Sequence, residues 1–163
     1  MKLLFAVLFL PLFSVSQTVH VKDGEILYEG KEKVEGVSPS QIHERIQHIL
    51  PSLVTDYRVE KQSWEMIRVR GKLKLETPYT IIRTVDYSLE LRAIENGFQY
   101  LIDSVSFTEQ TRGEKPETKS SKEILKNMSE QGEIVGETER LLNETDMRFQ
   151  RVLAMLKNRI ANR

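Results

Sequence analysis

Cysteine is absent from this chain of 163 residues, which excludes disulfide bonds, thiolate metal sites, cysteine nucleophiles and lipidation on an amino-terminal cysteine. Only three histidines occur, and no nucleophile elbow, phosphate-binding loop or zinc motif is present. Neither sign of charge predominates, because 24 basic residues balance 24 acidic ones. That balance argues against nucleic acid as a partner and against a general attraction to anionic lipid.

Long apolar runs are also scarce. The first one, Leu3 to Phe13, follows a positive Lys2 and precedes the small residues at 14–16. It is shorter than the roughly 20 residues of a transmembrane helix and is typical of a signal peptide. We predict that residues 1–16 are a signal peptide cleaved between Ser16 and Gln17, with an uncleaved anchor or a buried core segment as alternatives. The mature protein is then periplasmic or secreted and has no membrane span.

What the chain does contain is a strong period-two pattern between Tyr79 and Thr108. From Tyr79 to Leu91 every second residue except Arg83 is apolar, and the residues between them are mostly polar. Such alternation predicts a half-buried antiparallel strand. Asn96–Gly97 then favours a tight turn into a second apolar strand, so this stretch is a long β-hairpin.

Changes of parity predict irregularities in two strands. In the second strand of the hairpin, Ile102 and Val105 lie on opposite faces unless one residue is inserted. A β-bulge near Asp103–Ser104 returns both side chains to the core. In the strand region 59–75 the apolar positions change parity between Met66 and Ile67, where we expect a bulge or a break.

Residues 25–35 read as a first strand with a bulge or bend at Gly30. A helix follows, because Ser38 is a favoured cap and Pro39 fits the first helical position. Pro51 limits this helix, although a last turn through Leu53 is compatible with it. The apolar positions of the helix have helical spacing and predict one face packed on a sheet. They are Ile42, Ile46, Ile49 and Leu50.

The carboxyl-terminal part divides into two segments. Residues 109–120 contain no large apolar residue and are interpreted as a flexible linker. Residues 121–163 carry apolar side chains close to a three-four repeat and are predicted to be helical, with a kink or division at Gly132 and Gly136. The apolar stripe packs either on its own sheet or on another chain, so the segment is also a candidate for a protein partner or self-association.

The order is therefore strand, helix, three strands and a long helix. It predicts an α+β fold, a curved antiparallel sheet of about four strands with helices on one face. The predicted domain spans residues 17–108, followed by the linker and the helical segment.

The run Val34–Ile42, which leads into an amphipathic helix, resembles the start of a domain of unknown function. That family occurs in exported proteins of Gram-negative gut and environmental bacteria. The resemblance covers roughly residues 25–108 and implies a fold like that of the TATA-binding protein, a curved antiparallel sheet backed by helices. It implies no activity, cofactor or site residue.

Two groups of side chains are candidates for a binding site. Glu44 and His48, four residues apart on the predicted helix, can chelate a metal weakly, but a surface pair without function is the better interpretation. The second group alternates along a strand with apolar residues and is interpreted as a solvated face rather than an anion site. It consists of Arg68, Arg70, Lys72 and Lys74.

These observations favour an exported, non-catalytic envelope protein that binds a protein or an envelope component, with no catalytic, cofactor or metal residues. The alternative is a periplasmic hydrolase that uses the carboxylates of Asp86, Glu90 and Asp103, and a pocket in which two of them face one another would support it. Trp64 is expected in the core, with an exposed anchor as the alternative.

Overall fold

The computed structural model describes residues 20–54, 56–77, 80–130 and 135–161, and the predicted signal peptide lies outside them. Within these ranges the elements are β1 (Val21–Lys22), β2 (Glu25–Ile26), β3 (Tyr28–Lys33), α1 (Pro39–Leu53), β4 (Arg58–Gln62), β5 (Met66–Lys74), β6 (Ile81–Ile94), β7 (Gly97–Thr111), β8 (Glu117–Ser120), α2 (Ser121–Glu130) and α3 (Val135–Ala161).

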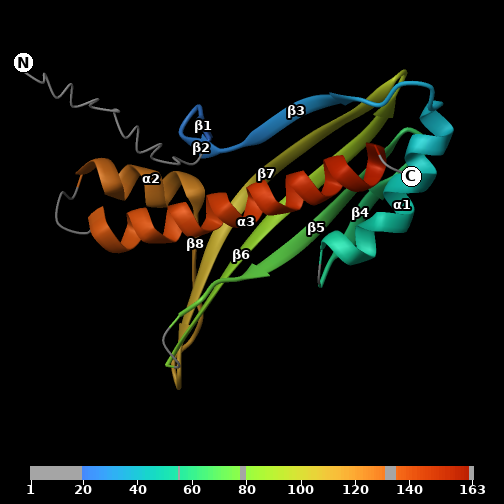
Figure 1. The fold of residues 1–163 in the computed structure, drawn as a ribbon. Coiled ribbons are helices and arrows are strands. Elements are labelled where there is room, and N and C mark those ends of the chain that lie inside the picture. The colour runs from blue at the N-terminus through green and yellow to red at the C-terminus, as the bar shows by residue number, and fades with distance from the viewer. Residues whose placement is uncertain (1–19, 55, 78–79, 131–134, 162–163) are drawn as a thin grey trace, which may run out of the picture.

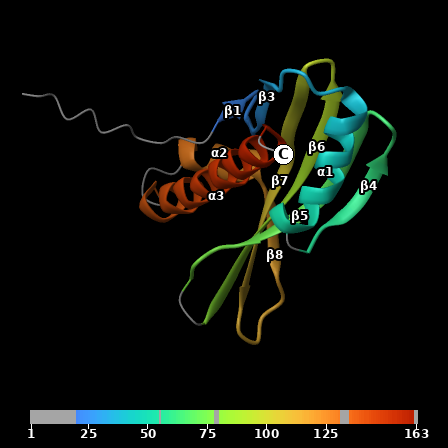
Figure 2. The same ribbon diagram turned by 45° about the vertical axis from the view of Figure 1, so that its right-hand side comes forward.

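The predicted α+β architecture is confirmed. The main sheet has the order β3-β7-β6-β5-β4, β8 also pairs with β7, and every pairing is antiparallel (Figure 1). It therefore has six described strands rather than about four. The long helices α1 and α3 lie on the same face of this twisted sheet, and no described helix covers the opposite face (Figure 2).

The β6–β7 hairpin forms the centre of the sheet, as its alternation predicts. Val85, Leu89 and Leu91 of β6 are completely buried. The β-bulge predicted near Asp103–Ser104 is confirmed, because the register between β6 and β7 shifts between Asp86 and Ser88 and Ser104 has a φ of 54°. Val105 and Ile102 are consequently both buried in the core, although their positions differ by an odd number.

Two glycines allow other groups to approach the backbone closely. Gly97 is the first residue of β7 and not a central turn residue, since it pairs with Ile94; a Cβ there would overlap the carbonyl oxygen of Glu32. Gly30 forms no bulge and pairs in register with Tyr100. A side chain at Gly30 would collide with the Tyr100 ring, so the glycine makes room for that ring.

Helix α1 begins as its sequence predicts. The Ser38 side chain accepts a hydrogen bond from the backbone N–H of Gln41, whose side chain accepts one from the N–H of Ser38 at 3.0 Å. This capping box satisfies donors that a helix start otherwise leaves free. The helix continues through Pro51 to Leu53 and buries its apolar positions on the sheet.

Two predictions about the chain's connections are wrong. Residues 109–120 are not a flexible linker, because β7 extends to Thr111 and β8 pairs with it from Glu117 to Ser120. Backbone pairing there needs no large apolar side chain, which is why composition did not reveal it. The strand region 59–75 is broken at 63–65, slightly before the expected position, into β4 and β5.

The segment predicted as one helix comprises α2 and α3, and the residues between them, including Gly132, lie outside the described ranges.

The apolar stripe of α3 packs on its own sheet. The Phe149 ring meets Tyr28 and Tyr87 edge-to-face, with centroids 5.3 and 5.0 Å apart. The Tyr28 hydroxyl donates a hydrogen bond to Asp146 at 2.6 Å. The pKa of Tyr28 is raised mainly by burial and secondly by this hydrogen bond.

Tyr87 suggests a test of the core. Its hydroxyl is buried above Gly71 and has no hydrogen-bond partner among the described residues. Because an unpaired buried hydroxyl is costly, Tyr87→Phe is expected to raise the free energy of unfolding by about 1 kcal/mol, measured by urea titration. A clear loss of stability would instead mean that the hydroxyl has a partner, such as a buried water.

The same residue predicts sensitivity to alkali. Burial raises the pKa of Tyr87 to about 12, whereas an unfolded tyrosine ionises near pH 10. The unfolded chain therefore loses its proton first, so the stabilisation is complete below about pH 10 and falls as the pH rises toward 12. Tyr87→Phe is expected to reduce this alkaline loss, leaving the part that comes from Tyr28.

Candidate functional site: the open face of the sheet

The face of the sheet opposite the helices carries a network of charged side chains that joins four strands. It is built by alternation: in β5, Ile67 and Val69 face the helices, so Arg68 and Arg70 point to the other side. Register then places Glu90 and Ser88 of β6 beside them. We call this side the open face.

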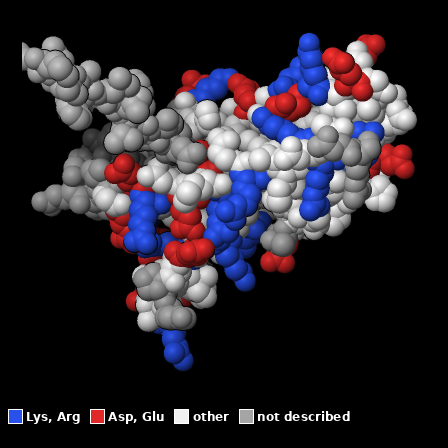
Figure 3. All heavy atoms as spheres, in the orientation of Figure 1, with Lys and Arg blue, Asp and Glu red and all other residues white. Residues whose placement is uncertain are grey.

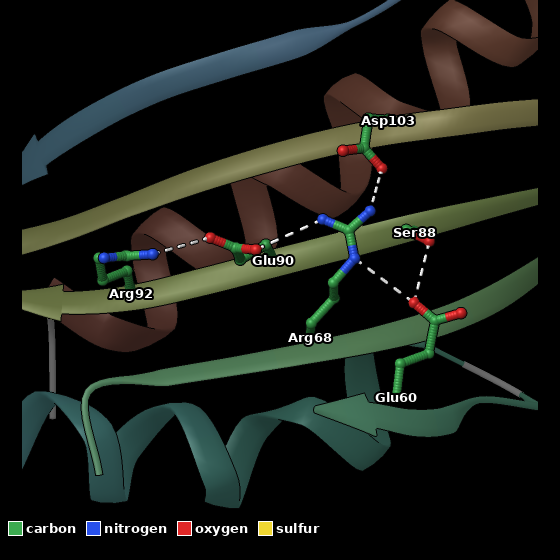
Figure 4. Close-up of polar contacts among 6 residues, drawn as sticks. All are labelled: Glu60, Arg68, Ser88, Glu90, Arg92 and Asp103. Carbon is green, nitrogen blue, oxygen red and sulfur yellow. Dashed lines mark hydrogen bonds and ion pairs between the residues drawn. The ribbon is translucent and has the colours of Figure 1, made fainter. Parts of the chain in front are cut away.

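Arg68 holds the centre of the open face together (Figure 4). Its guanidinium lies 3.4 Å from Glu60, 3.3 Å from Glu90 and 2.5 Å from Asp103, so it joins β4, β5, β6 and β7. Ser88 donates a hydrogen bond to Glu60 at 3.2 Å. Partial burial opposes the charged form of Arg68, but the hydrogen bonds that it donates to Asp103 and Glu90 outweigh this effect and raise the pKa of Arg68.

The structure brings together two of the three carboxylates named for a hydrolase, but through a shared cation. Glu90 and Asp103 both bind Arg68, and Asp86 lies 3.6 Å from Lys72. A hollow beside β3 is lined by Glu90 and by neither Asp86 nor Asp103. Carboxylates paired in this way offer no general acid and base facing a common substrate.

Strand β4 adds two cations that sequence reasoning missed. Arg58 lies beside Arg70 and Lys61 lies beside Arg68, although positions three apart on a strand normally face opposite ways. A register shift between Val59 and Lys61 puts both on the open face. The polar sequence of β4 contains no alternation that reveals either the strand or the shift.

Trp64 is not in the core. It lies between β4 and β5, where the chain turns, and its side chain is 74% exposed. The expectation that it lies in the core is wrong, because the break at 63–65 removes this residue from the sheet. The alternative, an exposed anchor, agrees with its position.

The Glu44–His48 pair on α1 has no further metal-binding groups around it among the described residues. Glu44 and His48 are exposed, and His43 lies 3.1 Å from the side chain of Gln47. Within the described ranges no group of three or more potential ligands is close enough to hold a metal ion.

A groove of about 340 Å³ separates α2 and α3 from the far ends of β6, β7 and β8. Phe107, Ile124 and Leu141 contribute its apolar part. Its charged rim is paired internally, because Arg83 binds Glu109 at 2.6 Å and also contacts Glu137. These ion pairs connect the sheet to α3 and leave no unpaired charge of Arg83 for a ligand.

On the side of the molecule that carries α3, acidic and basic side chains are interspersed (Figure 3). None of the described helices is long and apolar enough to cross a membrane.

Comparison with known proteins identifies the fold. The structure is similar to a TBP-like protein from Parabacteroides distasonis, with a TM-score of 0.73 and 14% identity over 88% of this chain and 97% of the other. It is also similar to a DUF4468 family protein from Bacteroides ovatus, with a TM-score of 0.62 and 14% identity over 89% and 93%. No family model and no curated protein matches the sequence. The protein therefore has a TBP-like fold, shared with solved bacterial domains that include one of unknown function.

Proposed function

We propose that this protein is an exported, non-catalytic binding module of the bacterial envelope that contacts a protein or an envelope component through the open face. The observation that carries the proposal is the one-sided fold, in which α1 and α3 cover one face of the sheet and no described helix covers the other (Figure 2). Export is inferred from the apolar run Leu3–Phe13 and the small residues that follow it.

The open face is a better interface than the carboxyl-terminal helix. The apolar stripe of α3 is used within the molecule, since Phe149, Leu156 and Ile160 are completely buried. Self-association through that stripe would require α3 to leave the sheet. The hydrolase alternative is not favoured, because Arg68 and Lys72 pair with the carboxylates on which it depends.

Site-specific photo-crosslinking in the native envelope tests the proposal. A photoreactive residue at Gln99, which is exposed on the open face, is expected to give discrete adducts. The same residue at Ala154, exposed on α3, is the matched control and is expected to give none. Adducts from Ala154 alone would assign the interface to the helix, and no adduct of protein or lipid from either position would contradict a binding function.

Export has its own measurement. Cell fractionation is expected to recover the protein outside the cytoplasm, with Gln17 as its first residue in amino-terminal sequencing. Recovery in the cytoplasm with residues 1–16 retained would show that the envelope assignment is wrong.

A further inference from the structure

Charge is unevenly distributed over a chain whose formal net charge is zero. On β4–β7 the open face has seven cationic side chains against four carboxylates, a surplus of three positive charges. The carboxylates are Glu60, Asp86, Glu90 and Asp103, and the cations are Arg58, Lys61, Arg68, Arg70, Lys72, Lys74 and Arg92. A patch of this kind attracts anions even where the whole molecule does not.

Part of this cationic surface is unneutralised. Arg58, Lys61 and Lys74 are exposed, and within the described ranges no carboxylate lies at ion-pair distance from any of them. Register places Lys61 beside Arg68, and Lys74 lies six residues further along β5, a separation of about 20 Å. Such spacing suits several anionic groups spread over a surface and not one chelated anion.

An apolar anchor lies at the end of the same two strands. Trp64 joins β4 to β5 and is 74% exposed, more than any other large apolar side chain described. Tryptophan is enriched where a membrane meets water, because its ring is apolar and its N–H is polar. The chain has no other tryptophan.

From these observations we infer that the open face docks on the surface of an anionic lipid bilayer. Arg58, Lys61 and Lys74 contact lipid phosphates, and Trp64 enters the headgroup region at the edge of the sheet. This inference rests on the proposed function, because it assigns a partner to the same face. A bilayer suits this arrangement, since its phosphates are spread over a surface as wide as the row of cations and its interfacial layer accepts the Trp64 ring.

Vesicle co-sedimentation tests the inference with the chain from Gln17 onward, so that the apolar run Leu3–Phe13 cannot insert. Binding is expected to vesicles of phosphatidylcholine with phosphatidylglycerol and not to phosphatidylcholine alone, and it is expected to weaken as salt is added. Each basic residue near an anionic surface contributes about fivefold in affinity, so K61Q/K74Q is expected to weaken binding on the order of 20-fold.

A matched variant distinguishes the effect of charge on the open face from the effect of total charge. R140Q/R151Q removes the same charge from exposed positions on α3 and is expected to change binding by less than about twofold. Since Trp64 is the single tryptophan, its emission is expected to shift to the blue on anionic vesicles and to be quenched by brominated lipids. Trp64→Ser is expected to weaken sedimentation with these vesicles.

Several outcomes would overturn the inference: equal binding to neutral vesicles, equal loss in R140Q/R151Q, or no blue shift of Trp64. Binding to soluble polyglutamate without binding to vesicles would assign the open face to an acidic protein. Protein adducts from Gln99 together with no vesicle binding would leave the proposed function standing and refute this inference. Absence of both would refute the two together.

Discussion

Replacing Phe149 by alanine is expected to lower the free energy of unfolding by about 3–5 kcal/mol. The Phe149 ring is completely buried between Tyr28 and Tyr87, so its loss leaves a cavity where α3 meets β3 and β6. Domains of this size are stable by roughly 5–15 kcal/mol, so the variant loses much of its margin. Urea titration followed by circular dichroism measures it; Trp64, already exposed, is a poor reporter of unfolding.

The matched control is Met147→Ala, two residues earlier on the same helix. Met147 is 54% exposed, and its truncation is expected to change stability by less than about 0.5 kcal/mol. If Phe149→Ala and Met147→Ala have equal effects, the packing of α3 on the sheet does not stabilise the fold as described.

Removal of α3 is expected to abolish folding. Six apolar side chains of this helix are buried, and burial of each contributes about 1.5–3 kcal/mol, so roughly 9–18 kcal/mol is lost. That loss equals or exceeds the whole stability of an ordinary domain. A chain ending at Glu130 is therefore expected to be insoluble, or to lack a cooperative thermal transition in calorimetry. The six residues are Leu142, Phe149, Val152, Leu153, Leu156 and Ile160.

A shorter truncation supplies the comparison. A chain ending at Ala161 keeps every described residue of α3 and is expected to melt as the full chain does. If the chain ending at Glu130 were monomeric and cooperatively folded, the part of the chain before α3 would form an independent domain and α3 would be an appendage.

Local signals predicted the elements that depend on local chemistry. Ser38 and Pro39 predict the start of α1, and the alternation of β6 predicts its buried face, because caps and side-chain periods are properties of neighbouring residues. The bulge at Ser104 was predictable, because Ile102 and Val105 can both face the core only if one residue is inserted between them.

The errors concern residues whose environment is set from far along the chain. Strand β8 forms because its backbone pairs with the free edge of β7, and the side chains of residues 117–120 give no sequence signal for that pairing. Trp64 is exposed because the chain breaks beside it, so hydrophobicity alone misplaced it.

The open face shows the same limit. Arg68, Arg70, Lys72 and Lys74 were visible as a charged period in the sequence, and the interpretation as a solvated strand face agrees with their geometry. The surplus of positive charge was not visible, because it arises when β4 brings Arg58 and Lys61 beside β5. The central position of Arg68 among three carboxylates likewise depends on pairing between strands.

The irregularity of β4 also opposes pairing of this edge strand with another molecule. This strand lies at one edge of the sheet, and all five of its residues are exposed. An unprotected edge strand is a template for pairing with another copy, which leads to fibres or amorphous aggregates. The bulge between Val59 and Lys61 interrupts the regular row of backbone donors and acceptors, and a lysine at an edge is costly to cover. The features that enrich the open face in cations thus also keep neighbouring molecules from extending the sheet.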